Sequence, residues 1–304
     1  MTCYHPVPVW KAKQANPSGK HSVVFSEHLG IDGTRFEIPC GGCIGCRLDR
    51  AAEWQTRMLH ESKCHRMNCF LTLSYAPENL PPYGTLVKKD FQDFMKRLRC
   101  HIYPQKVRYY MCGEYGENTE RPHYHAILFG YDFADKKHYK KGSRGDQMYT
   151  SATLDKLWGR GHCFIGSVTP ESCGYVARYV MKKITGEAGK LHYTRVDKDT
   201  GELVPIQPEY ANMSLKPAIG ATFYEQFQKE IHNQDSVLIK GKKRKVPRYY
   251  DKQLDKKDPY RLEELKYLRS EAAKTRAADN TDDRLAVREE FKKERVKNLI
   301  RRFE

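Results

Sequence analysis

The pattern of apolar positions in the first third of the chain predicts strands and helices that pack together. Residues 67–75 form an apolar run with little alternation, which is typical of a strand covered on both faces. Residues 47–63 and 90–102 instead place apolar side chains at helical spacing. We therefore expect a central strand at 67–75, with two amphipathic helices around it.

The next stretch adds the rest of a sheet. Residues 108–114 and 121–130 are each predicted to be a strand, and the turn formers Gly116 and Asn118 lie between them. Beyond them, the pattern predicts a short helix, a strand and a longer helix, at 151–158, 161–168 and 169–186. This order predicts an α+β fold, with helices packed on a central, mainly antiparallel sheet.

The helix predicted over 169–186 has signals at both ends. Thr169 suits the N-cap position, and Gly186 suits the position that ends a helix. Tyr175 and Tyr179 are four residues apart and therefore share one helix face. They would be either two packing tyrosines or a pair that faces a common ligand.

Two histidines flank one bulky residue near the start of the strand predicted over 121–130. Because His123 and His125 are alternate residues, their side chains project from the same face of that strand. A hairpin would place Glu114, at the end of the preceding strand, beside them. Two imidazoles and one carboxylate can bind Mg²⁺ or Mn²⁺ and leave positions open for a phosphate oxygen. A pair of buried core histidines is the plainer alternative.

Three motifs together resemble the HUH endonucleases that initiate rolling-circle replication. They are residues 112–117, 121–125 and 175–179, and more narrowly they resemble the initiators of microviruses, especially of the gokushovirus type. Residues 70–75 match the first motif of that family as well. The resemblance covers about residues 40–183, and its motifs occur in the order of the family.

The resemblance implies a mechanism and a set of site residues. These are ligands of a catalytic divalent ion (Glu114, His123 and His125), two nucleophiles (Tyr175 and Tyr179) and two assisting lysines (Lys182 and Lys183). Attack on single-stranded origin DNA would leave a 5′-phosphotyrosine and a free 3′-hydroxyl, and strand joining would follow. If one tyrosine acts alone, the spacing to Lys182 favours Tyr179. The resemblance also implies an HUH nuclease fold with the metal ligands on the open face of its sheet.

The charge of the chain agrees with a nucleic-acid partner. The net charge is +16 and the pI is about 9.3, which favours a polyanion. The sequence has no G-x4-G-K-[ST] motif, so we expect a host helicase and host replication proteins as partners. It also has no run of 18 apolar residues and no signal pattern, so we expect a soluble protein in the cytoplasm of a bacterial host, without membrane contact.

Four cysteines near the N-terminus form a second candidate metal site. Cys40, Cys43 and Cys46 follow one another in a glycine-rich stretch, and Cys3 is the natural fourth ligand. Four thiolates would make a closed, tetrahedral site for structural zinc. A reduced, cysteine-rich loop and an iron–sulfur cluster are the open alternatives.

Basic segments lie outside these motifs. Residues 136–146 are predicted to be a basic loop that suits single-stranded DNA or is a plain surface loop. Residues 236–304 hold 22 Lys and Arg against 13 Asp and Glu, so +9 of the total +16 lies there. A basic hairpin should turn near Lys240 and Gly241, and one or two charged helices should follow over 259–303, with a break near 279–280.

These patterns divide the chain into three predicted segments. They are a cysteine-rich segment at 1–46, a nuclease domain at 47–235, and a basic extension with a hairpin and helices at 236–304. Three other functions stay open. A plasmid or mobilisation relaxase would use the same chemistry, a zinc or iron enzyme would use the triad without a tyrosine adduct, and a non-catalytic protein would bind nucleic acid without nicking it.

Overall fold

A computed structural model describes residues 3–17, 19–116, 119–142, 145–179, 184 and 186–297. The chain divides into two compact units. We call Met1–Arg50 with Leu254–Leu299 the terminal unit, and Ala51–Gln253 with Ile300–Glu304 the sheet unit. The division into segments 1–46, 47–235 and 236–304 stays a prediction.

The sheet unit is built on one antiparallel sheet. Within the described residues the sheet has seven strands, in the order β12-β5-β6-β4-β9-β8-β7, and every neighbouring pair is antiparallel. In chain order the strands are β4 (Asn68–Ser74), β5 (Arg108–Tyr115), β6 (Pro122–Phe129), β7 (Lys137–Lys141), β8 (Gln147–Thr150), β9 (Cys163–Gly166) and β12 (Tyr210–Met213). The α+β prediction is therefore confirmed, and so is the central position of β4.

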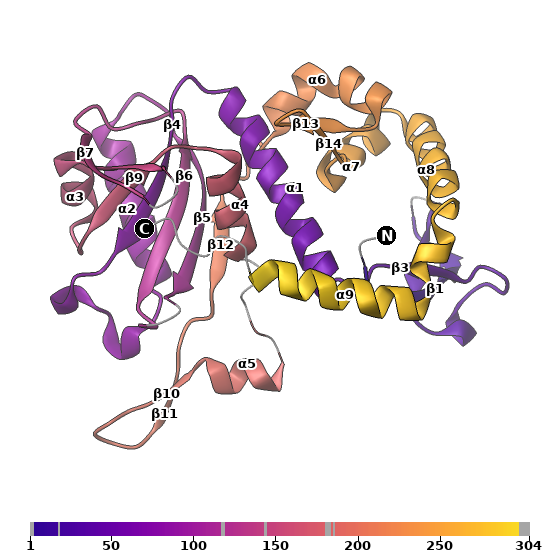
Figure 1. Ribbon diagram of the computed structural model, residues 1–304, viewed down its shortest axis with the longest axis horizontal. Coiled ribbons are helices and arrows are strands. Elements are labelled where there is room, and N and C mark those ends of the chain that lie inside the picture. The colour runs from indigo at the N-terminus through magenta and orange to yellow at the C-terminus, as the bar shows by residue number, and fades with distance from the viewer. Residues whose placement is uncertain are drawn as a thin grey trace. The chain divides into compact units, whose positions relative to one another are not determined.

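Helices cover both faces of this sheet (Figure 1). One face packs with α2 (Lys88–His101) and α3 (Ala152–Trp158) around Leu71 and Leu73 of β4. The other face carries Phe70 and packs with α1 (Ile44–Lys63) and α4 (Pro170–Tyr179). The alternation of side chains along β4 thus supplies both cores.

The expected open face of the sheet is not open. His125 lies on the face that α4 covers, and its side chain is only 1% exposed. The reason is that α4 carries a nearly continuous apolar surface, including Cys173, Val176 and Ala177, which are buried against that sheet face.

Two strands of the sheet were not predicted. Residues 136–146 were expected to form a loop, but β7 occupies Lys137–Lys141 and pairs with β8. Its run of charged residues hid the strand, and such charges are common on edge strands because they discourage pairing with another chain. At the opposite edge, β12 is four residues long, too short to show a clear alternation.

The helix predicted over 169–186 is shorter in the structure. Here α4 ends at Tyr179 in the part of the chain that is described, and Ile184 is not helical. Lys182 and Lys183 lie outside the described residues. Its N-terminus is as predicted, because the Ser172 amide donates to Thr169 Oγ1 at 3.1 Å and the Thr169 amide donates to Ser172 Oγ at 2.8 Å.

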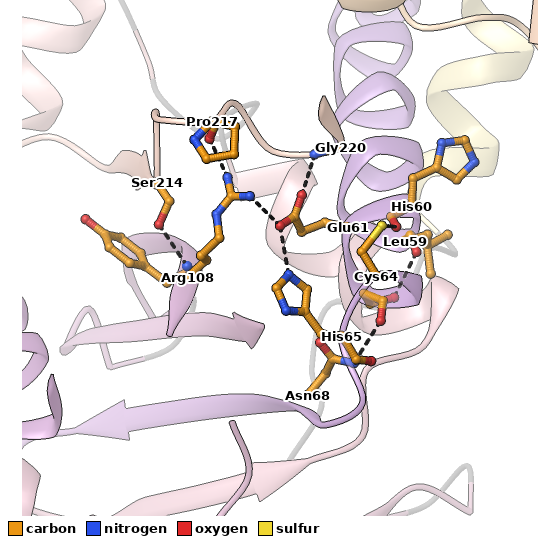
Figure 2. A network of polar contacts seen from close by, with 12 residues as sticks. Leu59, His60, Glu61, Cys64, His65, Asn68, Arg108, Ser214, Pro217 and Gly220 are labelled. Carbon is orange, nitrogen blue, oxygen red and sulfur yellow. Dashed lines mark hydrogen bonds and ion pairs between the residues drawn. The ribbon is translucent and has the colours of Figure 1, made fainter. Parts of the chain in front are cut away.

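A buried ion pair joins the end of α1 to β5. Figure 2 shows Arg108, His65 and the Gly220 amide converging on the Glu61 carboxylate, whose side chain is fully buried. The distances to Glu61 are 2.7 Å from Arg108 Nη1, 3.0 Å from His65 Nε2 and 2.7 Å from the Gly220 amide. Gly220 has a φ of +79°, and a Cβ there would lie 2.8 Å from the Tyr250 hydroxyl, so this position requires glycine.

The remaining parts of the sheet unit are small. They are η2 (Pro77–Asn79), η3 (Pro82–Gly84), α5 (Glu187–His192), β10 (Thr194–Val196), β11 (Leu203–Pro205), α6 (Ala221–Gln234), β13 (Val237–Ile239) and β14 (Lys242–Arg244). The predicted hairpin turn at Lys240 and Gly241 is confirmed, with positive φ at both residues. Helix α7 (Arg248–Lys257) begins in the sheet unit and ends in the terminal unit.

The terminal unit combines a small sheet with two charged helices. Its sheet has the order β2-β1-β3, formed by β1 (Val7–Ala15), β2 (His21–Val24) and β3 (Phe36–Ile38), and η1 (Glu27–Leu29) lies between the last two. These strands are mostly exposed, so they lack the apolar alternation that would have predicted them. The helices are α8 (Pro259–Lys274) and α9 (Asp282–Lys297), with η4 (Ala277–Asn280) at the predicted break. No helix among the described residues is long and apolar enough to cross a membrane.

Candidate active site

The hairpin of β5 and β6 brings one carboxylate and two imidazoles together. Residue Glu114 pairs with His123 across the two strands, and Cys112 pairs with His125. Oε1 of Glu114 therefore lies 2.6 Å from Nε2 of His123 and 3.1 Å from Nε2 of His125. The structure thus places the three predicted ligands in one cluster, while their role in binding an ion stays a prediction.

The other nitrogen of each imidazole fixes how its ring is presented. Nδ1 of His123 lies 3.1 Å from the Arg121 carbonyl oxygen, which can only accept a hydrogen bond, so this nitrogen carries the proton. Nδ1 of His125 lies 3.1 Å from Thr72 Oγ1. In a neutral His123 the lone pair on Nε2 then faces an oxygen of Glu114, an arrangement that is repulsive unless a proton or a metal ion lies there.

The charge on Glu114 favours a metal ion. Burial raises the pKa of this carboxyl, but the hydrogen bonds from His123 and His125 outweigh burial and lower the pKa to about 2. The group is therefore ionised at neutral pH. Adjacent ligands of a small octahedral ion, with bonds of about 2.1 Å, lie about 3 Å apart, and the observed spacings are close to that value. The three residues therefore fit Mg²⁺ or Mn²⁺.

Both predicted tyrosines reach this cluster from α4. The Tyr175 hydroxyl lies 3.3 Å from Nε2 of His125. The ring of Tyr179 stacks on the His125 ring, with centroids 5.6 Å apart and planes 15° apart. The two tyrosine rings contact each other edge to face, at a centroid distance of 4.6 Å. The structure therefore brings both together at the histidines, whereas Lys182 and Lys183 fall outside its described part.

The surroundings keep Tyr179 protonated. Burial raises the pKa of its hydroxyl far above the ordinary value, and the nearby negative charge of Glu114 raises it further. A phenolate at this position would thus need a positive charge beside it. Burial also lowers the pKa of Arg178, which lies next to both tyrosines in the sequence of α4.

Comparison with known proteins connects this geometry to a family. A sequence profile for replication-associated proteins of the ORF2 type matches residues 68–184, which include all five residues of the cluster. The chain is 31% identical to replication-associated protein ORF2 of Spiroplasma virus 4, over 90% of this chain and 87% of that protein. The chain belongs to the replication-associated proteins of microviruses.

Two further members of this family are similar over most of the chain. Replication-associated protein VP4 of Bdellovibrio phage phiMH2K is 33% identical, over 85% of this chain and 79% of its own length. Replication-associated protein ORF4 of Chlamydia phage 1 is 26% identical, over 71% of this chain and 53% of its own length. No solved structure matches the chain. The HUH assignment of the fold is therefore still a prediction.

Sequence reasoning missed several residues that support the family's cluster. Phe70 stacks on His125 at a centroid distance of 5.6 Å, and Thr72 contacts the same ring. Both face the site because β4 pairs with β6, with Thr72 directly opposite His125. The contact could have been found only from the strand order. Gln55, which donates to the Pro170 carbonyl at 2.5 Å and so holds the start of α4, left no signal in the sequence.

A pocket of about 210 Å³ lies beside the cluster, in the sheet unit. Its lining includes Phe70 and Thr72 of β4, Phe164 of β9 and Met148 of β8. The exposed Tyr139 of β7 lies next to Phe164, with ring centroids 5.3 Å apart. Aromatic and cationic side chains thus continue from the cluster towards the charged edge strand β7.

The four N-terminal cysteines gather in the terminal unit. Sulfur atoms of Cys3, Cys40, Cys43 and Cys46 all lie within 4.8 Å of one another. All ten cysteines of the chain are described, and each is a free thiol. Burial acts to raise the pKa of Cys43, but amide donors from Tyr4 and Cys46 bring it down to about 7. The predicted cluster therefore forms, and four thiols of this kind can hold a metal ion.

Proposed function

We propose that this protein initiates rolling-circle replication by nicking single-stranded DNA at the phage origin. The observation that carries the proposal is the convergence of Glu114, His123 and His125 with two tyrosines of one helix. The family membership supports the role in replication. The reaction takes place in the cytoplasm of a bacterial host, where a host helicase and replication proteins act with the initiator.

The cluster prepares a site for one divalent ion. Glu114, His123 and His125 would hold Mg²⁺ or Mn²⁺ through one carboxylate oxygen and two Nε2 atoms. When bound, such an ion supplies positive charge that neutralises a phosphate oxygen and favours an ionised tyrosine nearby. Arg121 and Thr72 orient the two imidazoles, so the ligands are ready before DNA arrives.

A tyrosine of α4 then acts as the nucleophile. Its hydroxyl loses a proton, and its oxygen forms a bond to phosphorus while the bond from phosphorus to the 3′ oxygen breaks. The 3′ oxygen takes up a proton, and the 5′ end stays on the tyrosine. At an ordinary pKa of about 10, ionisation at pH 7 costs about 4 kcal/mol, and burial adds to that cost for Tyr179. Lys182 and Lys183, which follow α4 in the sequence, are proposed to reduce it.

Two tyrosines allow cleavage and joining in alternation. While Tyr175 or Tyr179 carries the 5′ end of the displaced strand, the other can cleave the regenerated origin. The new 3′-hydroxyl then attacks the first phosphotyrosine, which restores a phosphodiester bond and closes a circle without ATP. The edge-to-face contact of the two rings supports this scheme, because both hydroxyls belong to one cluster.

Single-stranded DNA would reach the cluster across β9 and β7. Phe164 and Tyr139 provide rings on which bases can stack, and Lys140 lies next to Tyr139, with its ammonium 5.7 Å from the ring centroid. Alternating rings and cations suit single strands, because bases stack on the rings while phosphates pair with the cations. The pocket beside Thr72 would take a base next to the cleaved phosphate.

A denaturing gel of protein with labelled single-stranded origin DNA tests the proposal. We expect a covalent adduct that requires Mn²⁺ or Mg²⁺, persists in Tyr175→Phe or Tyr179→Phe, and is absent from the double variant. Tyr103→Phe is the matched control, because Tyr103 is 84% exposed. If DNA binds but no adduct forms with either metal, the protein is a non-catalytic binder and the proposal fails.

A further inference from the structure

The cysteine cluster of the terminal unit has the dimensions of a site for one metal ion. Four thiolates around a single zinc ion, with bonds of about 2.3 Å, place their sulfur atoms about 3.8 Å apart. The sulfur atoms of Cys3 and Cys43 are 3.9 Å apart, and all four lie within 4.8 Å of one another. In a four-iron cluster each cysteine binds a different iron at a separate corner of a cube, so the sulfur atoms are spread more widely.

Backbone amides point at these sulfur atoms. The Cys40 amide donates to Cys3 Sγ at 3.2 Å, and the Cys43 amide donates to Cys40 Sγ at 3.3 Å. Cys43 Sγ accepts from the amides of Tyr4 and Cys46, at 3.4 and 3.5 Å. Such donors stabilise negative charge on sulfur, as a set of metal-bound thiolates requires. Gly41, with a φ of +76°, provides the left-handed backbone position that the loop needs between Cys40 and Cys43.

The terminal unit has few other means of staying folded. Its buried apolar side chains, apart from cysteines and among the described residues, are Tyr4, Val9, Leu254, Leu262, Leu265 and Leu285. The three leucines between 254 and 265 form a cluster of their own, which leaves the small sheet of β1, β2 and β3 almost without a core. Small folds of this kind usually need disulfides or a structural metal, and the cysteines here are free thiols.

We infer that Cys3, Cys40, Cys43 and Cys46 bind one structural zinc ion, and that this ion, in place of an apolar core, keeps the N-terminal part of the terminal unit folded. The ligands join the first residues of the chain to the loop before α1 and to the first turn of α1, where Cys46 lies. All four positions are filled by sulfur, so the site is closed and has no position for a substrate. The inference does not rest on the proposed nicking activity.

Metal analysis of the full-length protein tests this inference. The protein is purified without chelators, and its zinc and iron contents are measured by mass spectrometry. We expect about one zinc per chain in the natural protein, and less than a tenth of that in Cys40→Ser and in Cys43→Ser. Two controls should keep the zinc: Cys100→Ser, which changes an exposed cysteine of α2, and Glu114→Gln, which changes the other cluster.

Two further measurements on the natural protein do not depend on variants that fold poorly. Replacement of the metal by Co²⁺ should give the intense visible absorption of tetrahedral cobalt bound to thiolates. Removal of the metal by a chelator should open residues 1–50 to proteases while 51–253 stays resistant. Zinc below a tenth per chain, iron in its place, or zinc that is unchanged in both serine variants would overturn the inference.

Discussion

The two donor clusters of this protein are supported in different ways. Glu114, His123 and His125 lie on paired strands in the middle of a seven-stranded sheet, and side chains or carbonyls from neighbouring strands orient them. The four cysteines lie mostly in loops of a unit with little apolar core, and backbone amides are the groups that contact their sulfur atoms. One cluster is held by the fold, whereas the other holds the fold.

This difference teaches what a metal ion would do in each place. An ion at a site that is already organised contributes to chemistry, because the ligands keep their positions without it. An ion among flexible loops contributes its binding free energy to folding. Substitutions in the two units should therefore separate activity from stability, and the following changes test that separation.

The largest expected effect is on activity, in Glu114→Gln. The amide keeps the size of the side chain but removes the charge that draws the ion, so adduct formation should fall by about 10³-fold or more. The melting temperature and the zinc content should stay close to those of the natural protein. Glu78→Gln, in an exposed turn, is the control and should nick normally. Normal adduct formation by Glu114→Gln would separate the cluster from catalysis.

The next effect is on the stability of the sheet unit, in Glu61→Ala. This change leaves Arg108, His65 and the Gly220 amide without their shared acceptor (Figure 2). Loss of one partner from a buried ion pair costs on the order of 3–5 kcal/mol of unfolding free energy, which denaturant titration would measure. Glu225→Ala, at an exposed site of α6, should cost far less. Equal stability of the two variants would mean that the network is not a structural lock.

A smaller effect should appear as a dependence of stability on pH. Burial and the charge of Lys63 lower the pKa of His60 from 6.5 to about 3, so the folded protein keeps this imidazole neutral where the unfolded chain protonates it. Stability is therefore lost as the pH falls below 6.5, by about 2 kcal/mol between pH 7 and pH 5. His60→Asn should lack this part of the pH dependence. An unchanged dependence in His60→Asn would assign the loss to other groups.

The smallest effect should concern DNA affinity. Lys242, Lys243 and Arg244 are exposed on the β13–β14 hairpin, and no described acidic side chain is paired with them. Their replacement by Gln should weaken DNA binding about tenfold at low salt and reduce the salt dependence, by up to about 0.9 for each lost phosphate contact. Nicking at saturating DNA should not change. An unaltered salt dependence would show that the hairpin does not contact DNA.

Much of the sheet unit could be predicted from local patterns. The apolar run of β4, the caps of α4 and the hairpin of β5 and β6 depend on neighbouring residues, and all three are visible in the sequence. The spacing of Glu114 and His123 was informative for the same reason, because a hairpin puts them opposite each other.

The rest depends on contacts between distant residues. Thr72 meets His125 only because β4 pairs with β6, and β12 joins the sheet at an edge about a hundred residues after its partner β5. The terminal sheet was missed because its strands bury almost nothing and therefore show no periodicity. Coverage of the metal-ligand face by α4 likewise depends on tertiary packing, which the resemblance did not reveal.

The most direct test of the central claim is to locate the DNA adduct in the chain. Trypsin cleaves after Arg160, Arg178 and Lys182, so it places Tyr175 in peptide 161–178 and Tyr179 in peptide 179–182. After nuclease and trypsin digestion of the adduct, mass spectrometry should find a nucleotide on one of these two peptides, and on both across the population if the tyrosines alternate. A nucleotide attached to any other peptide would contradict the account.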